Sequence, residues 1–128
     1  MSVATAKKRP KNLNLITIRL PLPALVSILH RLSGLLLFLI IPALLLMLQT
    51  SLASAEGFNS LVKAAHHPVS KLLLIGLSWA FLHHLFAGVR HLLSDMNLGL
   101  ELAQARVINK VVLTASLTLT AFVGVFIW

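Results

Sequence analysis

The stretch VSKLLLIGLSWAFLHHLFAGVRHLL, residues 69–93, decides the fold because it is long and apolar enough to cross a lipid bilayer as a helix. It nevertheless carries His84 well inside the apolar run and His91 seven residues later. Seven residues are two helical turns, so both imidazoles lie on one face of the helix. Because an ionisable side chain at membrane depth is unfavourable without a partner, the pattern predicts a cofactor held between helices.

Composition places the whole chain in a membrane. It has 128 residues, of which 58% are hydrophobic and 11% are charged, and its mean hydropathy is +0.93. Lipid must therefore cover much of its surface. The absence of cysteine excludes disulfides, thiolate-bound iron–sulfur clusters and a cysteine nucleophile. The net charge of +8 fits the cytoplasmic flank of a membrane protein, and we expect no nucleic-acid partner.

Three segments are long enough to span the bilayer, at about 24–48, 69–93 and 111–128. The sequence therefore predicts an all-α membrane protein with three transmembrane helices. We divide it into a cytoplasmic and interfacial N-terminal segment, 1–23, and a three-helix transmembrane anchor domain, 24–128.

The regions outside the spans carry helix-breaking and polar residues. Pro21 and Pro23 forbid a continuous helix into the first span, so we expect residues 13–20 to lie along the membrane interface. Segments 49–68 and 94–109 are polar and are predicted as the two loops.

The positive charges predict the orientation. Those near the first span and the second loop are Lys7, Lys8, Arg9, Lys11, Arg19, Arg90, Arg106 and Lys110, whereas only Lys63 and Lys71 lie near the first loop. The positive-inside rule then places the N-terminus and the second loop in the cytoplasm. The first loop and the C-terminus are then expected outside.

Polar residues of two spans are expected at one depth. Ser27, His30 and Arg31 lie near the cytoplasmic end of the first span, and Arg90 and His91 lie near the same end of the second. Antiparallel packing brings the two groups together, although they are far apart in the sequence.

This arrangement suits a haem. His84 lies about 10 Å deeper than His91, so an axial bond from His84 directs the propionates toward His30, Arg31 and His91, which compensate their charge. A second axial ligand is missing, because His30 is expected to lie too shallow and His83 projects about 100° away around the helix. We therefore expect another chain to supply it.

Each of these residues also has an ordinary structural explanation. His84 alone could hydrogen-bond a carbonyl of a neighbouring helix, and Arg31 alone could anchor the helix at the interface. The Ser27 hydroxyl could bond to its own helix. His83 is expected to face a helix neighbour or a water-lined gap, and His66 and His67 are expected to be exposed.

Two motifs resemble signatures of a known family. Arg9 and Pro10, the segment NLNLITIRLPLPA (12–24) and SILHRLSG (27–34) resemble the first signature of the cytochrome b subunit of succinate dehydrogenase. HLFAGVRHLLSD (84–95) resembles the second. The similarity covers nearly the whole chain and is greatest to the bacterial form, which implies a multi-pass protein of the bacterial inner membrane. Ser94 and Asn97 depart from the usual pattern of that family.

The resemblance implies a membrane anchor within a complex of four different subunits. A flavoprotein oxidises succinate, an iron–sulfur subunit carries the electrons to the membrane, and two hydrophobic anchors hold one haem b and form the ubiquinone site. It assigns one axial ligand to His84 and the other to the partner anchor. It places Ser27 and Arg31 at the quinone, and His30, Arg31 and His91 near the propionates. The chain alone is not expected to be catalytic.

Three alternatives stay open. The first is the anchor of a fumarate reductase, in which electrons flow from quinol to fumarate. The second is a structural anchor without haem, whose histidines bond to helix carbonyls. The third is a small transporter or channel subunit. We expect no polar lining residue in the third span, and the polar groups of the other spans gather at one depth, which disfavours transport.

Overall fold

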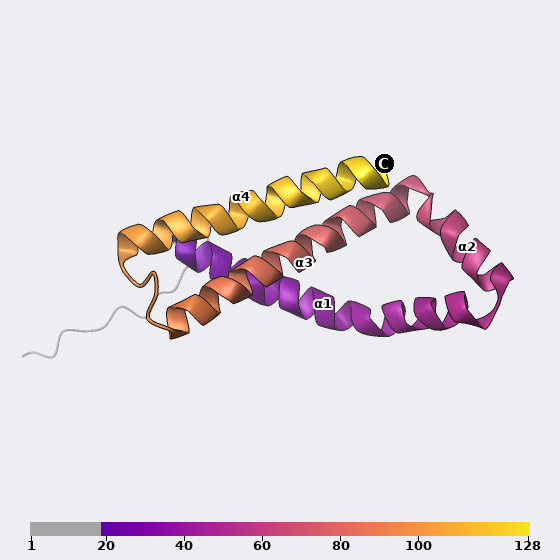
Figure 1. Ribbon diagram of the computed structural model, residues 1–128, viewed down its shortest axis with the longest axis horizontal. Coiled ribbons are helices and arrows are strands. Elements are labelled where there is room, and N and C mark those ends of the chain that lie inside the picture. Colours follow the sequence, from indigo (N-terminus) through magenta and orange to yellow (C-terminus); the bar gives the residue numbers. More distant parts are fainter. Residues whose placement is uncertain (1–18) are drawn as a thin grey trace, which may run out of the picture.

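A computed structural model describes residues 19–128, and within them every regular element is a helix. The helices are α1 (Leu22–Ala53), α2 (Ala55–Ala65), α3 (Pro68–Asp95) and α4 (Leu102–Ile127) (Figure 1). The interfacial placement predicted for residues 13–20 lies almost entirely outside the described residues. The all-helical fold class predicted from the sequence is confirmed.

Three of the helices are long and apolar enough to cross a bilayer. α1, α3 and α4 contain 32, 28 and 26 residues, and their most apolar windows have mean hydropathies of 2.4, 1.8 and 1.9. At 1.5 Å per residue they are about 48, 42 and 39 Å long, which exceeds the ~30 Å hydrocarbon layer. The chain is thus a multi-pass membrane protein, and each helix extends beyond its predicted span.

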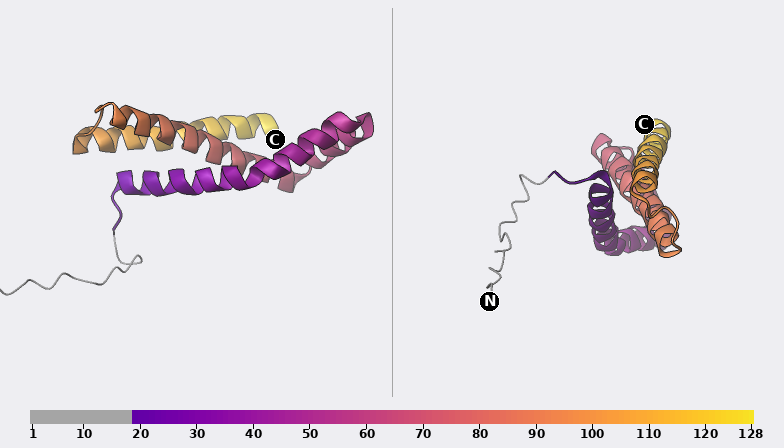
Figure 2. Two further views of the ribbon diagram at one scale, coloured as in Figure 1. Left: turned by 90° about the horizontal axis from the view of Figure 1, so that it is seen from below. Right: turned by 90° about the vertical axis from the view of Figure 1, so that its left-hand side faces the viewer.

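Prolines shape α1. Pro21 is its N-cap residue, in an extended conformation, and Pro23 lies in its first turn. A proline is tolerated there because the backbone N–H groups of the first turn have no acceptor within the helix. The helix therefore begins at Leu22, two residues before the predicted span. Pro42 lies inside the helix, and α1 changes direction near its middle (Figure 2), as expected where a proline removes a backbone hydrogen bond.

The first predicted loop is partly wrong, because segment 49–68 contains the end of α1 and all of α2. Ser54 is extended and ends α1, and its hydroxyl accepts a hydrogen bond from the Gly57 N–H at 3.0 Å. This cap starts α2 at once. Phe58 and Val62, four residues apart on α2, are 54% and 39% exposed. α2 bridges the separated ends of α1 and α3 (Figure 1).

α3 begins with a cap that the sequence analysis did not foresee. The ring nitrogen Nδ1 of His67 accepts a hydrogen bond from the Val69 N–H at 3.3 Å, and Pro68 occupies the first helical position. His66 and His67 are both exposed, as predicted.

The second predicted loop is also too long, since α3 continues to Asp95 and α4 begins at Leu102. The turn between them uses two left-handed residues, Asn97 with φ 62° and Gly99 with φ 74°. Asparagine and glycine are the residues that adopt this conformation most readily. The departure of Asn97 from the family pattern therefore falls at a position where asparagine suits the backbone.

The helices pack antiparallel with a small apolar core. α3 and α4 run side by side and α1 crosses α3 (Figures 1 and 2). The core cluster takes one residue from each long helix, Val26, Ala87 and Val112. Outside it, large apolar side chains are exposed along all three helices, and in the mostly apolar segment 41–50 every residue is exposed. Such a surface is stable only against lipid or other membrane subunits.

Candidate functional site

The three predicted haem-region histidines come together where α1 crosses α3. The imidazole of His84 stacks on that of His30, with centroids 4.2 Å apart and ring planes 14° from parallel. The His91 ring is tilted by 46° relative to that of His30, with its centroid 5.1 Å away. His30 comes from α1 and the other two come from α3, so the crossing of the two helices builds the cluster.

A backbone carbonyl fixes the orientation of the His84 ring. Nδ1 of His84 lies 3.1 Å from the carbonyl oxygen of His30. A carbonyl oxygen only accepts hydrogen bonds, so this contact places the proton of His84 on Nδ1. The lone pair is then on Nε2, the nitrogen left to bind a metal. Histidine ligands of metals commonly donate their other ring N–H to a carbonyl in this way.

Ser33 completes this contact from the next turn of α1. Its hydroxyl donates to the same His30 carbonyl at 2.9 Å, and its oxygen lies 3.4 Å from Nδ1 of His84. Ser33 is only 4% exposed. The sequence analysis gave it no role, although it stands three residues after His30, at helical spacing.

One glycine allows the His84 ring to lie this close to the backbone of α1. A Cβ atom on Gly34 would be 2.7 Å from Cε1 of His84, too close for any real contact. A Cβ atom on Gly88 would lie 3.6 Å from Nε2 of His30, which is an ordinary contact distance. Gly34 is therefore the glycine that the packing of His84 requires.

The predicted quinone residues lie on the neighbouring part of α1. Ser27 is half-buried and Arg31 is exposed, one helical turn further along. Their spacing places them on one face, with His30 beside it. Their role at a quinone stays a prediction.

The ring geometry corrects one step of the sequence analysis. His30 was expected to lie too shallow to bind the haem, yet its ring touches that of His84. Its orientation disqualifies it instead, because two rings in face-to-face contact leave no space for a porphyrin between them. The described residues contain no group of three histidine or acidic side chains able to hold a metal ion. The arrangement therefore fits a porphyrin ligated from one side by His84.

His83 points into the protein, as its position one residue before His84 predicts. It is fully buried, and its ring stacks on Trp79 with centroids 5.3 Å apart.

The expectation of a third span without polar lining is wrong, because α4 buries Asn109, Ser116 and Thr120. Ser116 and Thr120 are four residues apart, a helical spacing that the sequence already contained.

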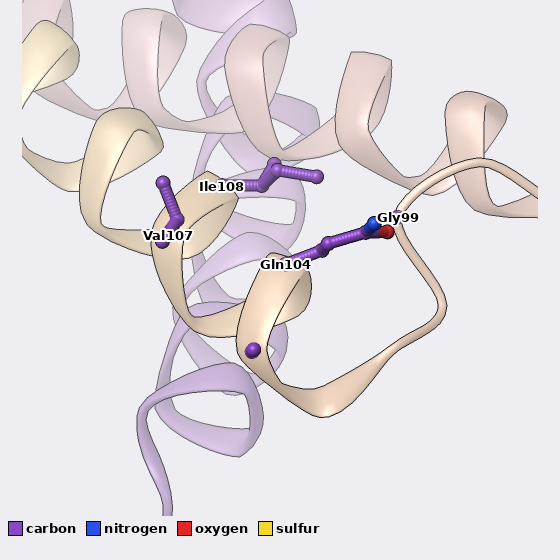
Figure 3. A pocket seen from close by; sticks show the side chains of 5 residues that line it. Gly99, Gln104, Val107 and Ile108 are labelled. Carbon is purple, nitrogen blue, oxygen red and sulfur yellow. The ribbon is translucent and has the colours of Figure 1, made fainter.

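A shallow apolar pocket lies at the turn between α3 and α4, away from the histidines (Figure 3). Gly99 borders it together with residues from the first turns of α4, including Val107 and Ile108. A second apolar groove between α3 and α4 is bordered by Arg90 and Phe86. Neither contains the residues predicted to bind haem.

Comparison with known proteins shows which family the chain resembles. Residues 5–123 match the family described as succinate dehydrogenase/fumarate reductase transmembrane subunit. The chain is 38% identical over 122 residues to the succinate dehydrogenase cytochrome b556 subunit of Coxiella burnetii, covering 94% of this chain and 98% of that protein. The subunits of the same name from Paracoccus denitrificans and Rickettsia felis are 32% and 30% identical, covering 87% and 92% of this chain and 85% and 92% of those proteins.

These matches extend over nearly the full length of the chain and include both sequence signatures. The resemblance to the cytochrome b subunit of succinate dehydrogenase is thus confirmed. The chain belongs to the family of succinate dehydrogenase/fumarate reductase transmembrane subunits.

Proposed function

We propose that this chain is the membrane-anchoring cytochrome b subunit of a succinate dehydrogenase, that it binds haem b through His84, and that it contributes Ser27 and Arg31 to a ubiquinone-reduction site. The contact that carries the proposal is the 3.1 Å approach of His84 Nδ1 to the His30 carbonyl. It holds the imidazole in the tautomer that an axial ligand needs.

A haem b bound at Nε2 of His84 supplies a one-electron carrier inside the membrane. His30 lies against the His84 ring, His91 lies near the His30 ring, and Arg31 is one residue from His30. These side chains are the candidates to hold the propionates by charge-assisted hydrogen bonds. The second axial ligand comes from a second hydrophobic anchor subunit, since the stacked His30 is unsuitable.

The chemistry of quinone reduction suits Ser27 and Arg31. Reduction places negative charge on the carbonyl oxygens of the quinone, which then take up protons. The Ser27 hydroxyl can donate a hydrogen bond to one such oxygen, and the Arg31 guanidinium stabilises the charge. Arginine does not release its proton, so the protons come from water or from a residue on a partner subunit.

The surroundings of the chain follow from its surface and its family. The apolar surface of α1 at 41–50 is available to lipid and to the second anchor. The distribution of cationic residues favours a cytoplasmic N-terminus and a cytoplasmic turn between α3 and α4, and the bacterial relatives favour a bacterial inner membrane. In this proposal the iron–sulfur and flavoprotein subunits bind on the cytoplasmic side. The names of the relatives favour succinate oxidation over fumarate reduction.

Purification of the tagged chain from its native membrane tests the proposal. We expect the flavoprotein, the iron–sulfur subunit and a second small hydrophobic chain to co-purify, together with a b-type α band in the reduced-minus-oxidised spectrum. Succinate should reduce ubiquinone in this preparation. Recovery of the four subunits without an α band would instead support an anchor without haem. Faster fumarate reduction by quinol than succinate oxidation would support a fumarate reductase.

A further inference from the structure

A layer of polar side chains lies inside the bundle between α3 and α4, outside the proposed haem and quinone sites. It consists of Trp79 and His83 on α3 and Ser116 and Thr120 on α4, and we call these four residues the polar layer. His83 and Ser116 are 0% exposed and Thr120 is 8% exposed. In a membrane-spanning bundle, polar groups in such a position require partners.

The packing register brings these residues to matching levels. Ile75 packs against Gly124 toward one end of the two helices, and Ala87 joins the core cluster with Val112 toward the other. Both pairs fit a single antiparallel register. Trp79 follows Ile75 by four residues and Thr120 precedes Gly124 by four, so these two share a level. One turn further, His83 and Ser116 share the next level.

Some hydrogen-bond donors and acceptors of the polar layer have no partner within the described part of the protein. The Nε1 of Trp79 and both ring nitrogens of His83 are buried without a hydrogen-bond partner among the described residues. The hydroxyls of Ser116 and Thr120 already donate to the carbonyls of Leu113 and Ser116, at 3.0 and 2.7 Å. Each hydroxyl therefore has only acceptor capacity left.

His83 needs both a donor and an acceptor. A neutral imidazole has one N–H and one lone pair, and neither ring nitrogen has a hydrogen-bond partner among the described residues. Nothing in the polar layer can donate to the His83 lone pair. The Trp79 N–H cannot do so, because the two rings stack with their planes 22° apart and both the N–H and the lone pair lie in those planes. Protonating His83 would instead bury a charge at membrane depth, which is more costly.

We propose that the polar layer binds at least one water molecule, which donates to the ring nitrogen of His83. Water supplies both donors and acceptors, and buried waters typically bind polar groups that the protein leaves unpaired. The proposed water site lies beside His83, the residue that precedes the haem ligand His84, where α3 faces α4. It keeps His83 neutral and satisfied within the bundle, and it does not depend on the haem or quinone assignments.

Hydroxyl-radical footprinting by X-ray radiolysis tests this proposal in the intact complex held in lipid nanodiscs with ¹⁸O-labelled water. A bound water produces radicals in place, so side chains beside it are oxidised although bulk solvent does not reach them. After correction for intrinsic reactivity, we expect Trp79 to be oxidised severalfold faster than Phe86. Phe86 is also partly enclosed, but it packs against the apolar core.

Two substitutions complete the design. His83→Phe keeps a ring but removes both nitrogens, and should lower Trp79 oxidation severalfold. Thr114→Ala removes an exposed hydroxyl of α4 that likewise bonds to its own helix, and should change nothing. If His83→Phe does not assemble, Ser116→Ala replaces it with the same expected direction. Trp79 oxidation as slow as that of Phe86, or unaffected by the substitution made in the polar layer, would overturn the proposal.

Discussion

The His84 ring on α3 stacks on the His30 ring on α1, with centroids 4.2 Å apart. The same two residues make a second contact, in which Nδ1 of His84 lies 3.1 Å from the carbonyl oxygen of His30. The ring of the proposed haem ligand is therefore oriented by the helix that crosses it. Substitutions on α1 should consequently be detectable in the spectrum of a haem bound from α3.

Gly34→Ala should disturb the haem ligand directly. The new methyl group would lie 2.7 Å from Cε1 of His84, so the ring or the helix has to move. We expect lower haem content in the purified complex, or an altered low-spin signal in electron paramagnetic resonance. Gly76→Ala is the matched control, because its Cβ would meet nothing within 4 Å. Normal haem content and an unchanged signal in Gly34→Ala would contradict the described packing.

Ser33→Ala should have a smaller effect of the same kind. It removes the hydroxyl that donates to the His30 carbonyl and lies beside Nδ1 of His84. Loss of one such hydrogen bond costs about 1 kcal/mol, so we expect a slightly lower melting temperature and a shift in haem midpoint potential. Ser51→Ala removes the same type of bond to its own helix at an exposed position and should leave the potential unchanged. Equal potentials in the two variants would exclude a positioning role for Ser33.

Ser27→Ala and Arg31→Ala should each slow ubiquinone reduction. They remove the proposed hydrogen-bond donor and the proposed positive charge, and removal of a donor to a reacting oxygen typically costs on the order of 10²-fold in rate. Succinate oxidation with an artificial acceptor should persist, because that acceptor takes its electrons before they reach the quinone. Both activities are measured on the assembled complex. Normal quinone kinetics in both variants would remove these residues from the site.

Asn97→Ala should destabilise the turn between α3 and α4. Asn97 has φ 62°, a left-handed conformation that costs a residue with an ordinary side chain about 1–2 kcal/mol. We expect a lower melting temperature of the complex, whereas Asn97→Gly should be neutral or mildly stabilising because glycine adopts this conformation freely. Equal melting temperatures for the alanine and glycine variants would show that the backbone at residue 97 imposes no such demand.

The sequence predicts the membrane-spanning segments well because hydropathy measures the quantity that the bilayer selects. It predicts helix ends less well, since a helix continues past the hydrocarbon layer. The first turns of α4 are polar but helical, so hydropathy assigned them to a loop. α2 was missed for a similar reason, because it lies in a polar segment. Phe58 and Val62, which are apolar and at helical spacing, were the signal for it in the sequence.

The candidate site likewise has features that the sequence predicts and features that depend on the fold. Histidines within a span are recognisable from residue type and position alone, and the sequence singled out His84 inside the second span and His30 near the end of the first. The stacking of their rings depends on how α1 crosses α3, which no local pattern encodes. The contacts of Ser33 and Gly34 with His84 depend on the same crossing, so these residues could be found only from the structure.

The central claim is that His84 ligates haem, and the variant His84→Leu tests it most directly. Leucine removes the lone pair while keeping an apolar side chain at membrane depth. His66→Leu, at an exposed position of the connection between α2 and α3, is the control. We expect the subunits of His84→Leu to co-purify with reduced haem content, or with haem whose low-spin electron paramagnetic resonance signal is altered, while His66→Leu matches the wild type. Full haem content with an unchanged low-spin signal in His84→Leu would contradict the account.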